Sequence, residues 1–256
     1  MKKRVNYDDL ADEYDQRYAG EQRSDTGEAL LSLTQDIRPA RVLEAGCGTG
    51  HWLEEMAGLV PGCFGLDYSS GMLDRAARRP VALTLVQGQA QSLPFAPVTF
   101  DLVCCVNAIH HFDAPRRFVE EAYRLLRPGG ALAIVGNGPH GRRDHWYVYD
   151  YFDGVYERDL DRFPSWQETE AWMAETGFTH ITRRVVEHIL DERRGRAVLD
   201  DPFLKKKSCS QLALLDDENY AAGICHLEAK LARAEAIGEI PVFRSSIELA
   251  MACGWK

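Results

Sequence analysis

The sequence lacks several features that would each indicate a particular class of protein. Its seven cysteines form no Cys-x-x-Cys pair, so neither a zinc site nor a thioredoxin-type redox motif is predicted. No uninterrupted apolar run is long enough to span a bilayer, and no apolar stretch follows the basic residues 1–4. We therefore expect a cytoplasmic protein with no metal site and no membrane partner.

The chain also lacks a positive charge balance. Lys and Arg number 30 against 39 Asp and Glu, and the formal net charge of −9 disfavours nucleic acid as a partner. Two basic stretches, residues 193–196 and 205–207, interrupt this acidic background. We predict that they form a solvated surface. The alternative is that they bind an acidic substrate or RNA.

Short apolar runs alternate with helical patterns through the first half of the chain. Strands are predicted near residues 41–45, 63–67, 81–86, 100–106 and 131–135, and helices over 51–59, 69–78 and 114–126. Nearly continuous apolar strands indicate a parallel sheet that is covered on both faces. This alternation predicts a doubly wound α/β fold.

The two ends of the chain have different patterns. Residues 7–36 predict two helices, and an aromatic-rich segment occupies residues 145–160. Ser165 with Glu168 forms a capping-box pattern that opens a helix, which Gly177 ends. A strand over 179–189, a long helix over 218–236 and a half-buried strand over 242–251 complete the prediction.

The most informative segment is the glycine-rich turn after the first strand. Gly46, Gly48 and Gly50 stand at relative positions one, three and five, whereas the dinucleotide fingerprint has its third glycine at position six, which is His51 here. The spacing argues against a nicotinamide-dependent oxidoreductase and for a smaller adenosyl ligand. An ordinary tight turn between strand and helix is the alternative.

Asp67 ends the second predicted strand. A carboxylate there can accept hydrogen bonds from both hydroxyls of a ribose. The alternative role is to cap the next helix, which Ser69 can do alone.

Five ordered stretches together resemble the class I S-adenosylmethionine-dependent methyltransferases, specifically the small-molecule type related to ubiquinone and menaquinone biosynthesis. They are VLEAGCGTG at 42–50, FGLDYS at 64–69, QGQAQSLPF at 87–95, FDLVCCVNAIHHF at 100–112 and LLRPGGALAIV at 125–135. Their order makes the resemblance far more specific than any single motif.

The resemblance implies roles for individual residues in binding S-adenosylmethionine, with S-adenosylhomocysteine as the product. The first stretch would cradle the methionine part and Asp67 the ribose. Tyr68 and Met72 would pack on the adenine, Gln89 and Ala90 would lie at its edge, and Asn107 would lie by the ligand through its backbone. An N-terminal helix would cover the cofactor. The residues carried over are Glu44, Gly46, Cys47, Gly48, Asp67, Tyr68, Met72, Gln89, Ala90, Asn107 and Tyr14. Gln89 departs from the family, because relatives often have an acid there; it keeps an acceptor oxygen without the charge.

Residues for the transfer itself are predicted at the end of the fourth strand and in the aromatic segment. His111, and with less support His110, can take a proton from an attacking group, although methyl transfer needs no base where positioning suffices. The alternative is that a histidine there only bonds loop backbone. The aromatic segment predicts an acceptor pocket, or equally a packed helix, through His145, Trp146, Tyr149 and Phe152.

The pattern and the resemblance together predict an α/β, doubly wound, Rossmann-like sheet. We expect seven mostly parallel strands with an antiparallel last strand, an N-terminal helical cap and a helical insertion before the last strand. Residues 1–38 form the cap, 39–138 the cofactor-binding core, and 139–256 the acceptor-side lid, insertion and closing strands of the same domain.

The predicted function is methyl transfer from S-adenosylmethionine to a small-molecule acceptor, without nucleic acid. An RNA-modifying methyltransferase and a protein that binds the cofactor without catalysis are the alternatives. The sequence leaves open the acceptor, the methylated atom (oxygen, nitrogen or carbon) and the oligomeric state.

Overall fold

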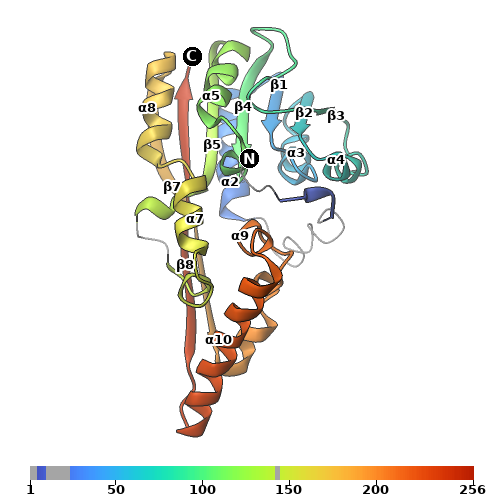
Figure 1. Cartoon of the computed structure of the whole chain (residues 1–256). Helices are drawn as coiled ribbons and strands as arrows, with labels where there is room; N and C mark the ends of the chain where they lie inside the picture. The colour runs from blue at the N-terminus through green and yellow to red at the C-terminus, as the bar shows by residue number, and fades with distance from the viewer. Residues whose placement is uncertain (1–4, 10–23, 142–144) are drawn as a thin grey trace. The chain divides into compact units, whose positions relative to one another are not determined.

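The computed structural model of the chain describes residues 5–9, 24–141 and 145–256. In the first half, strands and helices alternate as the apolar pattern predicts (Figure 1). The elements are η1 (Tyr7–Asp9), α2 (Asp25–Ile37), β1 (Arg41–Ala45), α3 (His51–Met56), β2 (Gly62–Asp67), α4 (Ser70–Ala76), β3 (Leu83–Gln87), β4 (Phe100–Val106), η3 (Ile109–His111), α5 (Pro115–Leu125) and β5 (Leu126–Asn137).

The second half is richer in short elements. A capping box at Ser165 opens α8, and Gly177, with φ of 109°, ends it, as predicted from their spacing. The elements are η4 (Pro139–Gly141), β6 (His145–Trp146), α6 (Val148–Tyr151), α7 (Val155–Arg162), α8 (Trp166–Thr176), β7 (Thr179–Arg194), η5 (Gly195–Asp200), η6 (Pro202–Leu204), α9 (Ser210–Ala213), α10 (Asp217–Ala236) and β8 (Val242–Trp255).

The strands of the described ranges form one eight-stranded sheet in the order β3-β2-β1-β4-β5-β8-β6, and β7 also pairs with β8. The pairs among β1 to β5 are parallel, while β8 runs antiparallel to β5 and to β6. The predicted fold class and the antiparallel last strand are confirmed. The extra strand beyond the seven predicted is β6, which has two residues and therefore no readable period.

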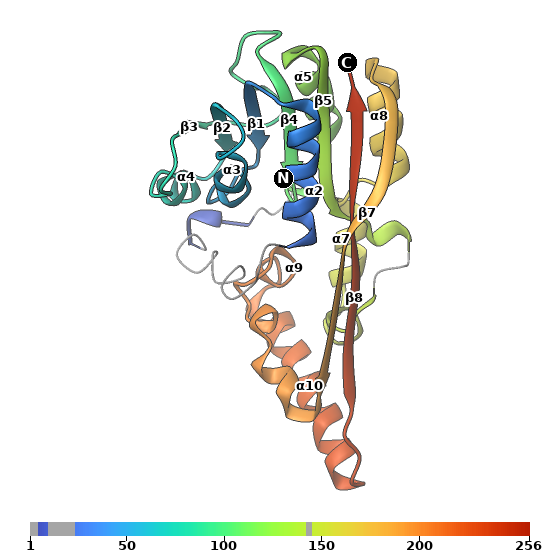
Figure 2. The same ribbon diagram turned by 180° about the vertical axis from the view of Figure 1, so that it is seen from behind.

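Two compact units divide the chain. The sheet unit comprises Asn6–Gly138, Pro164–Glu187 and Leu249–Lys256, and the second unit is built mainly of Pro139–Phe163 and His188–Glu248. Within the sheet unit, α2 lies over β4 and β5 on the side opposite to α5 (Figure 2). The side chains of Cys104 and Cys105 pack into the two opposite cores of this sheet, as strand alternation predicts.

All seven cysteines lie in the described ranges, and their burial is unequal. Six are buried, whereas Cys225 on α10 is exposed. Burial of a thiol in an apolar core raises its pKa, to about 11 for Cys63 and Cys253. These thiols are core residues.

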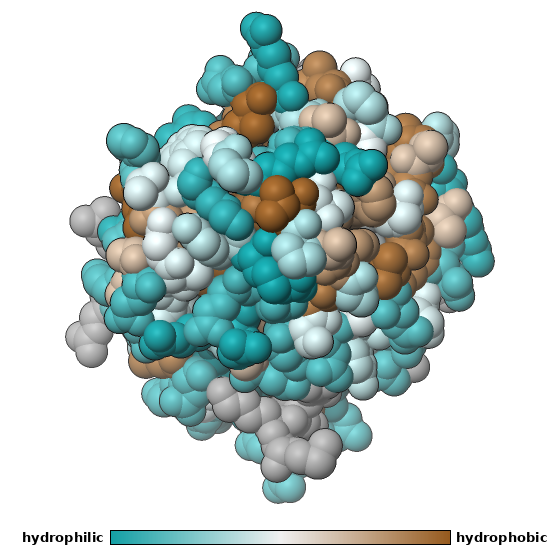
Figure 3. Space-filling view, turned by 90° about the horizontal axis from the view of Figure 1, so that it is seen from above, coloured by the Kyte–Doolittle hydropathy of each residue, from teal (hydrophilic) through white to brown (hydrophobic). Residues whose placement is uncertain are grey.

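Two further observations concern the described helices and one face of the surface. No helix within these residues is both long and apolar enough to cross a membrane. Because β8 runs antiparallel to β5 and ends at the top of Figure 1, the view from above faces the N-terminal ends of the parallel strands. That face is mostly hydrophilic, with apolar residues in small separate groups (Figure 3).

The N-terminal segment follows the prediction in part. The expected second helix is α2, capped by the side chain of Ser24, which accepts from the amide of Gly27. Tyr7–Asp9 form a 3₁₀ turn, and the rest of the first expected helix falls outside the described residues. The tertiary contacts of Tyr7 and Asp8, described below, hold this short turn against the sheet unit.

Candidate active site

The glycine-rich turn between β1 and α3 has the backbone that its sequence predicts. Gly46, Gly48 and Gly50 have φ values of 73°, 52° and 75°, a region that side chains disfavour. The amides of Gly46 and Cys47 both donate to the carbonyl of Leu66, which ties the turn to the end of β2. A Cβ on Gly46 would lie 2.5 Å from the Cβ of Ala108, so only glycine fits between β1 and the segment after β4.

Asp67 lies directly beside this turn. Its carboxylate accepts from the amide of Gly48 at 2.8 Å and from the amide of Ser69 at 2.9 Å, one bond to each oxygen. A carboxylate has about four acceptor positions, so that of Asp67 keeps acceptor capacity for the ribose. The alternative role as a helix cap is not the one observed, because Ser69 caps α4 through the amide of Met72.

Glu44 is the most unusual charged group of the site. It is 1% exposed, and neither side-chain oxygen has a hydrogen-bond partner among the described residues. Burial raises the pKa of Glu44 well above its usual range, and the negative charge of Asp67 raises it further. A cationic group suits this environment, and S-adenosylmethionine carries two, the ammonium and the sulfonium. Glu44 therefore fits its predicted role beside the methionine part.

The predicted adenine side contains exposed and buried residues. Tyr68 is 61% exposed and follows Asp67, whereas Met72 and Ala90 are buried. Gln89 is exposed, and its side-chain oxygen accepts from the amide nitrogen of Gln91 at 2.7 Å. The cofactor contacts of these residues stay predictions.

The segment after β4 brings His110 and His111 to the carboxyl end of the sheet, beside the switch in strand order between β1 and β4. Their rings lie 4.0 Å apart. Asn107, which precedes them, has a φ of 50° and donates its amide to the carbonyl of Val135. The expected catalytic role of the two histidines stays a prediction.

Two residues of η1 join this site that the sequence did not single out. The hydroxyl of Tyr7 and Nε2 of His111 share a hydrogen bond of 2.7 Å. The carboxylate of Asp8 accepts from the hydroxyl of Ser69 at 2.6 Å and from the amide of Gly71 at 2.8 Å. Tyr7 and Asp8 are adjacent in the chain. They thus bond to the segment after β4 and to the start of α4, which lie on the two sides of the glycine turn. Tyr14, predicted to lie near the cofactor, falls outside the described residues.

The predicted acceptor residues lie in the second unit, mostly in its core. Trp146 and Phe152 are buried, and the ring of Phe152 lies where a Cβ on Gly223 of α10 would be, at 2.2 Å. Tyr149 donates its hydroxyl to buried Asp159 at 2.9 Å, whereas His145 is exposed. Their role in substrate binding stays a prediction.

The two basic stretches are also in the second unit, and acids accompany them. Ion pairs join Arg193 to Asp191 and Asp201, Arg194 to Glu192, Arg196 to Glu235, and Lys206 to Asp217. This pairing reduces the positive potential that these stretches can offer to an acidic ligand.

Comparisons with known proteins agree with this geometry. A family model described as a methyltransferase domain matches residues 43–134. The malonyl-[acyl-carrier protein] O-methyltransferase of Methylococcus capsulatus is 30% identical over 246 residues, covering 87% of this chain and 81% of that protein. The enzyme of the same name from Enterobacter lignolyticus is 38% identical over 131 residues, about half (49%) of each protein.

Solved structures share the fold. The Haemonchus contortus phosphoethanolamine N-methyltransferase 2 in complex with S-adenosyl-L-methionine has a TM-score of 0.60 at 18% identity, covering 97% of this chain and 57% of that one. At this identity the likeness concerns the fold alone. The relative from Methylococcus capsulatus, which matches across most of both chains, shows the protein's family. The chain belongs to the class I S-adenosylmethionine-dependent methyltransferases of the small-molecule type, and its cofactor is S-adenosylmethionine.

Proposed function

We propose that this methyltransferase methylates a carboxylate oxygen of a small acyl group, and that the acyl group is malonyl held on a carrier protein. The observation that carries this proposal is the 30% identity to a malonyl-[acyl-carrier protein] O-methyltransferase over 87% of the chain. The match runs well beyond the cofactor-binding stretch, so it includes the residues outside 39–138 that we propose recognise the acceptor.

The residues of the site have distinct tasks in this proposal. Asp67 holds the ribose through its remaining acceptor capacity, and Glu44 lies with the cationic methionine part. When bound, S-adenosylmethionine supplies an electrophilic methyl group on its sulfonium sulfur. The chain then has to orient the acceptor and exclude water.

A carboxylate acceptor changes what is expected of His111. Carboxyl groups have ordinary pKa values of about 4, so the acceptor is already deprotonated near neutral pH and needs no general base. We propose that His111, fixed by its hydrogen bond to Tyr7, orients the acceptor instead of taking a proton. His110 supports it through the ring contact at 4.0 Å.

The other predicted functions have less support. An RNA substrate would need a basic surface, and the basic stretches of the second unit are paired with acids within a chain of net charge −9. We therefore propose a cytoplasmic enzyme that acts on its acceptor without nucleic acid or membrane. A turnover assay separates it from a protein that binds the cofactor without catalysis.

The test uses the purified full chain with methyl-labelled S-adenosylmethionine. Malonyl-carrier protein, malonyl-coenzyme A and free malonate are compared with acetyl-carrier protein, which has the same thioester but no free carboxylate. We expect label in the malonyl thioesters, and release of that label as volatile methanol after alkaline hydrolysis, because only a methyl ester is cleaved this way. Label that resists hydrolysis, or equal labelling of the acetyl control, would overturn the proposal.

A further inference from the structure

The loop between β3 and β4 is held at three places in the sheet unit. At its start, the amide of Gly88 donates to the carbonyl of Asp67 at 2.9 Å. At its end, the amides of Val98 and Thr99 donate to carbonyls at the end of α5, those of Arg124 and Leu125. Between these points two side chains of α5 hold the loop.

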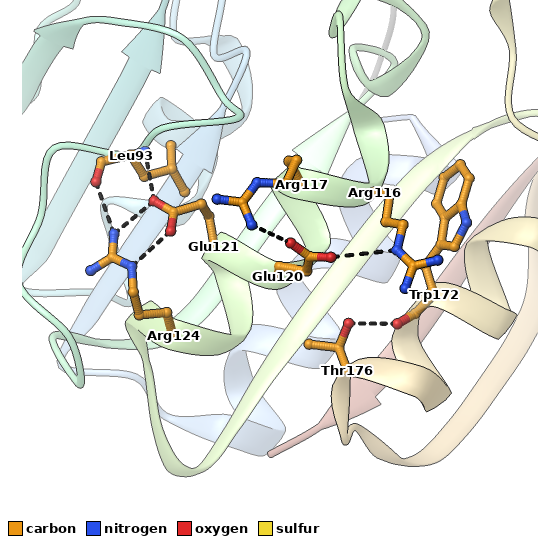
Figure 4. Close-up of polar contacts among 8 residues, drawn as sticks. All are labelled: Leu93, Arg116, Arg117, Glu120, Glu121, Arg124, Trp172 and Thr176. Atoms are coloured by element: carbon orange, nitrogen blue, oxygen red, sulfur yellow. Dashed lines mark hydrogen bonds and ion pairs between the residues drawn. The ribbon is translucent and has the colours of Figure 1, made fainter.

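Those side chains are Glu121 and Arg124, drawn in Figure 4. Glu121 accepts the amide of Leu93 at 2.9 Å, and Arg124 donates to the carbonyls of Leu93 at 3.0 Å and Phe95 at 2.9 Å. Arg124 also donates twice to Glu121, at 2.8 and 2.7 Å. The bonds from Arg124 keep the pKa of Glu121 below its usual range. The bidentate pair is thus rigid, charged and bonded to three backbone groups.

The held segment borders the nucleoside side of the site. It begins at the end of β3, which pairs with β2. Asp67, the last residue of β2, lies beside the glycine turn. Within it, Gln89 and Ser92 form a bridge, and Ala90 and Leu93 are buried in the same core cluster as α5. Fixing Leu93 and Phe95 therefore fixes the backbone that presents Gln89 and Ala90.

We propose that Glu121 and Arg124 are positioning residues for cofactor binding: through Leu93 and Phe95 they hold the Gln89–Ala90 segment in the conformation that contacts the adenine. The proposal rests on the proposed adenine role of Gln89 and Ala90. Neither member of the pair touches the cofactor. Their effect is on affinity, because a loose segment has to be ordered at the moment of binding.

The same helix offers a matched control. Arg117 donates to Glu120 at 2.6 Å, also three residues apart, but the two side chains are 62% and 32% exposed and the bond involves no loop backbone. Figure 4 shows both pairs on α5. Arg117→Met removes an arginine charge from the same helix and none of the loop contacts, and Glu120 keeps its second ion pair, to Arg116.

The experiment measures S-adenosylhomocysteine binding by calorimetry, which needs no acceptor. We expect Arg124→Met to raise Kd about tenfold and Arg117→Met to change it less than twofold. Glu121→Gln keeps an acceptor for Leu93 and raises Kd less than threefold. With an acceptor identified, Arg124→Met raises KM for S-adenosylmethionine and leaves kcat within about twofold.

Double-mutant cycles distinguish a positioning role of Arg124 from a general loss of rigidity, because residues that act through one another have non-additive effects on Kd. In a Gln89→Ala background, Arg124→Met should raise Kd less than threefold, whereas in a Glu44→Gln background, at the other end of the cofactor, it should still raise it about tenfold. Arg124→Lys gives the same pattern at smaller amplitude and replaces Arg124→Met where that variant does not fold.

Two results would overturn the proposal. The first is unchanged Kd with a lowered Tm in Arg124→Met, and the second is an equal loss in both backgrounds. Because the measurement is binding alone, failure of the malonyl proposal would leave this result interpretable.

Discussion

The hydroxyl of Tyr7 lies 2.7 Å from Nε2 of His111, although 104 residues separate them in the chain. Their rings meet edge to face with centroids 5.1 Å apart. One ring nitrogen of His111 is thus engaged by a residue of the N-terminal segment, and the orientation of the imidazole depends on that segment. The relationship makes the proposed positioning role of His111 testable from Tyr7 alone.

Tyr7→Phe should lower kcat while leaving cofactor affinity nearly unchanged. The variant removes one hydrogen bond, worth about 0.5–1.5 kcal/mol, and keeps the ring contact, so we expect kcat to fall about two- to tenfold. Steady-state kinetics with calorimetry on the same preparation measures both quantities. A rise in the S-adenosylhomocysteine Kd with kcat unchanged would instead assign Tyr7 to the cofactor.

His111→Ala tests whether the acceptor has to be deprotonated by the enzyme. For a carboxylate acceptor we expect kcat to fall less than about tenfold, with a flat rate between about pH 6 and 8 in the wild type. A general base would cost about a hundredfold or more, with a rate that rises across this pH range. A pH profile of kcat for both proteins distinguishes the two, and the second result would point to a hydroxyl or amine acceptor.

Asp67→Ala should weaken cofactor binding by about 1–3 kcal/mol, through loss of charge-assisted hydrogen bonds to the ribose. Asp67→Asn is the matched variant, since it keeps one acceptor oxygen and most of the packing. It should fall between wild type and alanine in affinity. Unchanged affinity in a folded Asp67→Ala protein would remove this residue from the ribose site.

Glu44→Gln should make the cofactor-free protein less sensitive to alkaline pH. Because the pKa of Glu44 is raised in the folded chain, its stability contribution is complete below the ordinary carboxyl pKa and is lost as pH rises through the folded pKa. We expect the wild-type Tm to fall as pH rises above the ordinary carboxyl pKa, and the Glu44→Gln curve to be flatter. Burial raises the pKa of Asp67 too, so some slope remains. Parallel curves of Tm against pH for the two proteins would contradict a raised pKa of Glu44 in the folded protein.

Local signals were enough for much of the fold and for the turn beside Asp67. The glycine spacing predicted a tight turn between strand and helix, where Gly46, Gly48 and Gly50 all have positive φ, and the Ser165 capping box and terminal Gly177 bounded α8 nearly to the residue. Such features depend on residues within a few positions of one another, so a short stretch of sequence is enough to predict them.

Long-range pairings left no comparable signal. Tyr7 has its partner 104 residues away and Asp8 has Ser69 61 residues away, and nothing near either residue indicates the contact. Spacing alone also fails to separate Glu121–Arg124 from Arg117–Glu120. Both are three-residue pairs on α5, and burial and the bonds to the backbone of Leu93 and Phe95 distinguish them.

Because the cysteines differ in burial, their modification by a thiol reagent can report when each of the two units opens. A bulky thiol reagent applied under native conditions should modify Cys225 at once and the six buried thiols only as the protein opens. The five buried thiols of the sheet unit and Cys209 of the second unit then time the opening of each unit separately. Peptide mass analysis of a labelling time course, with and without S-adenosylhomocysteine, should show the cofactor slowing modification of Cys47 far more than that of Cys209.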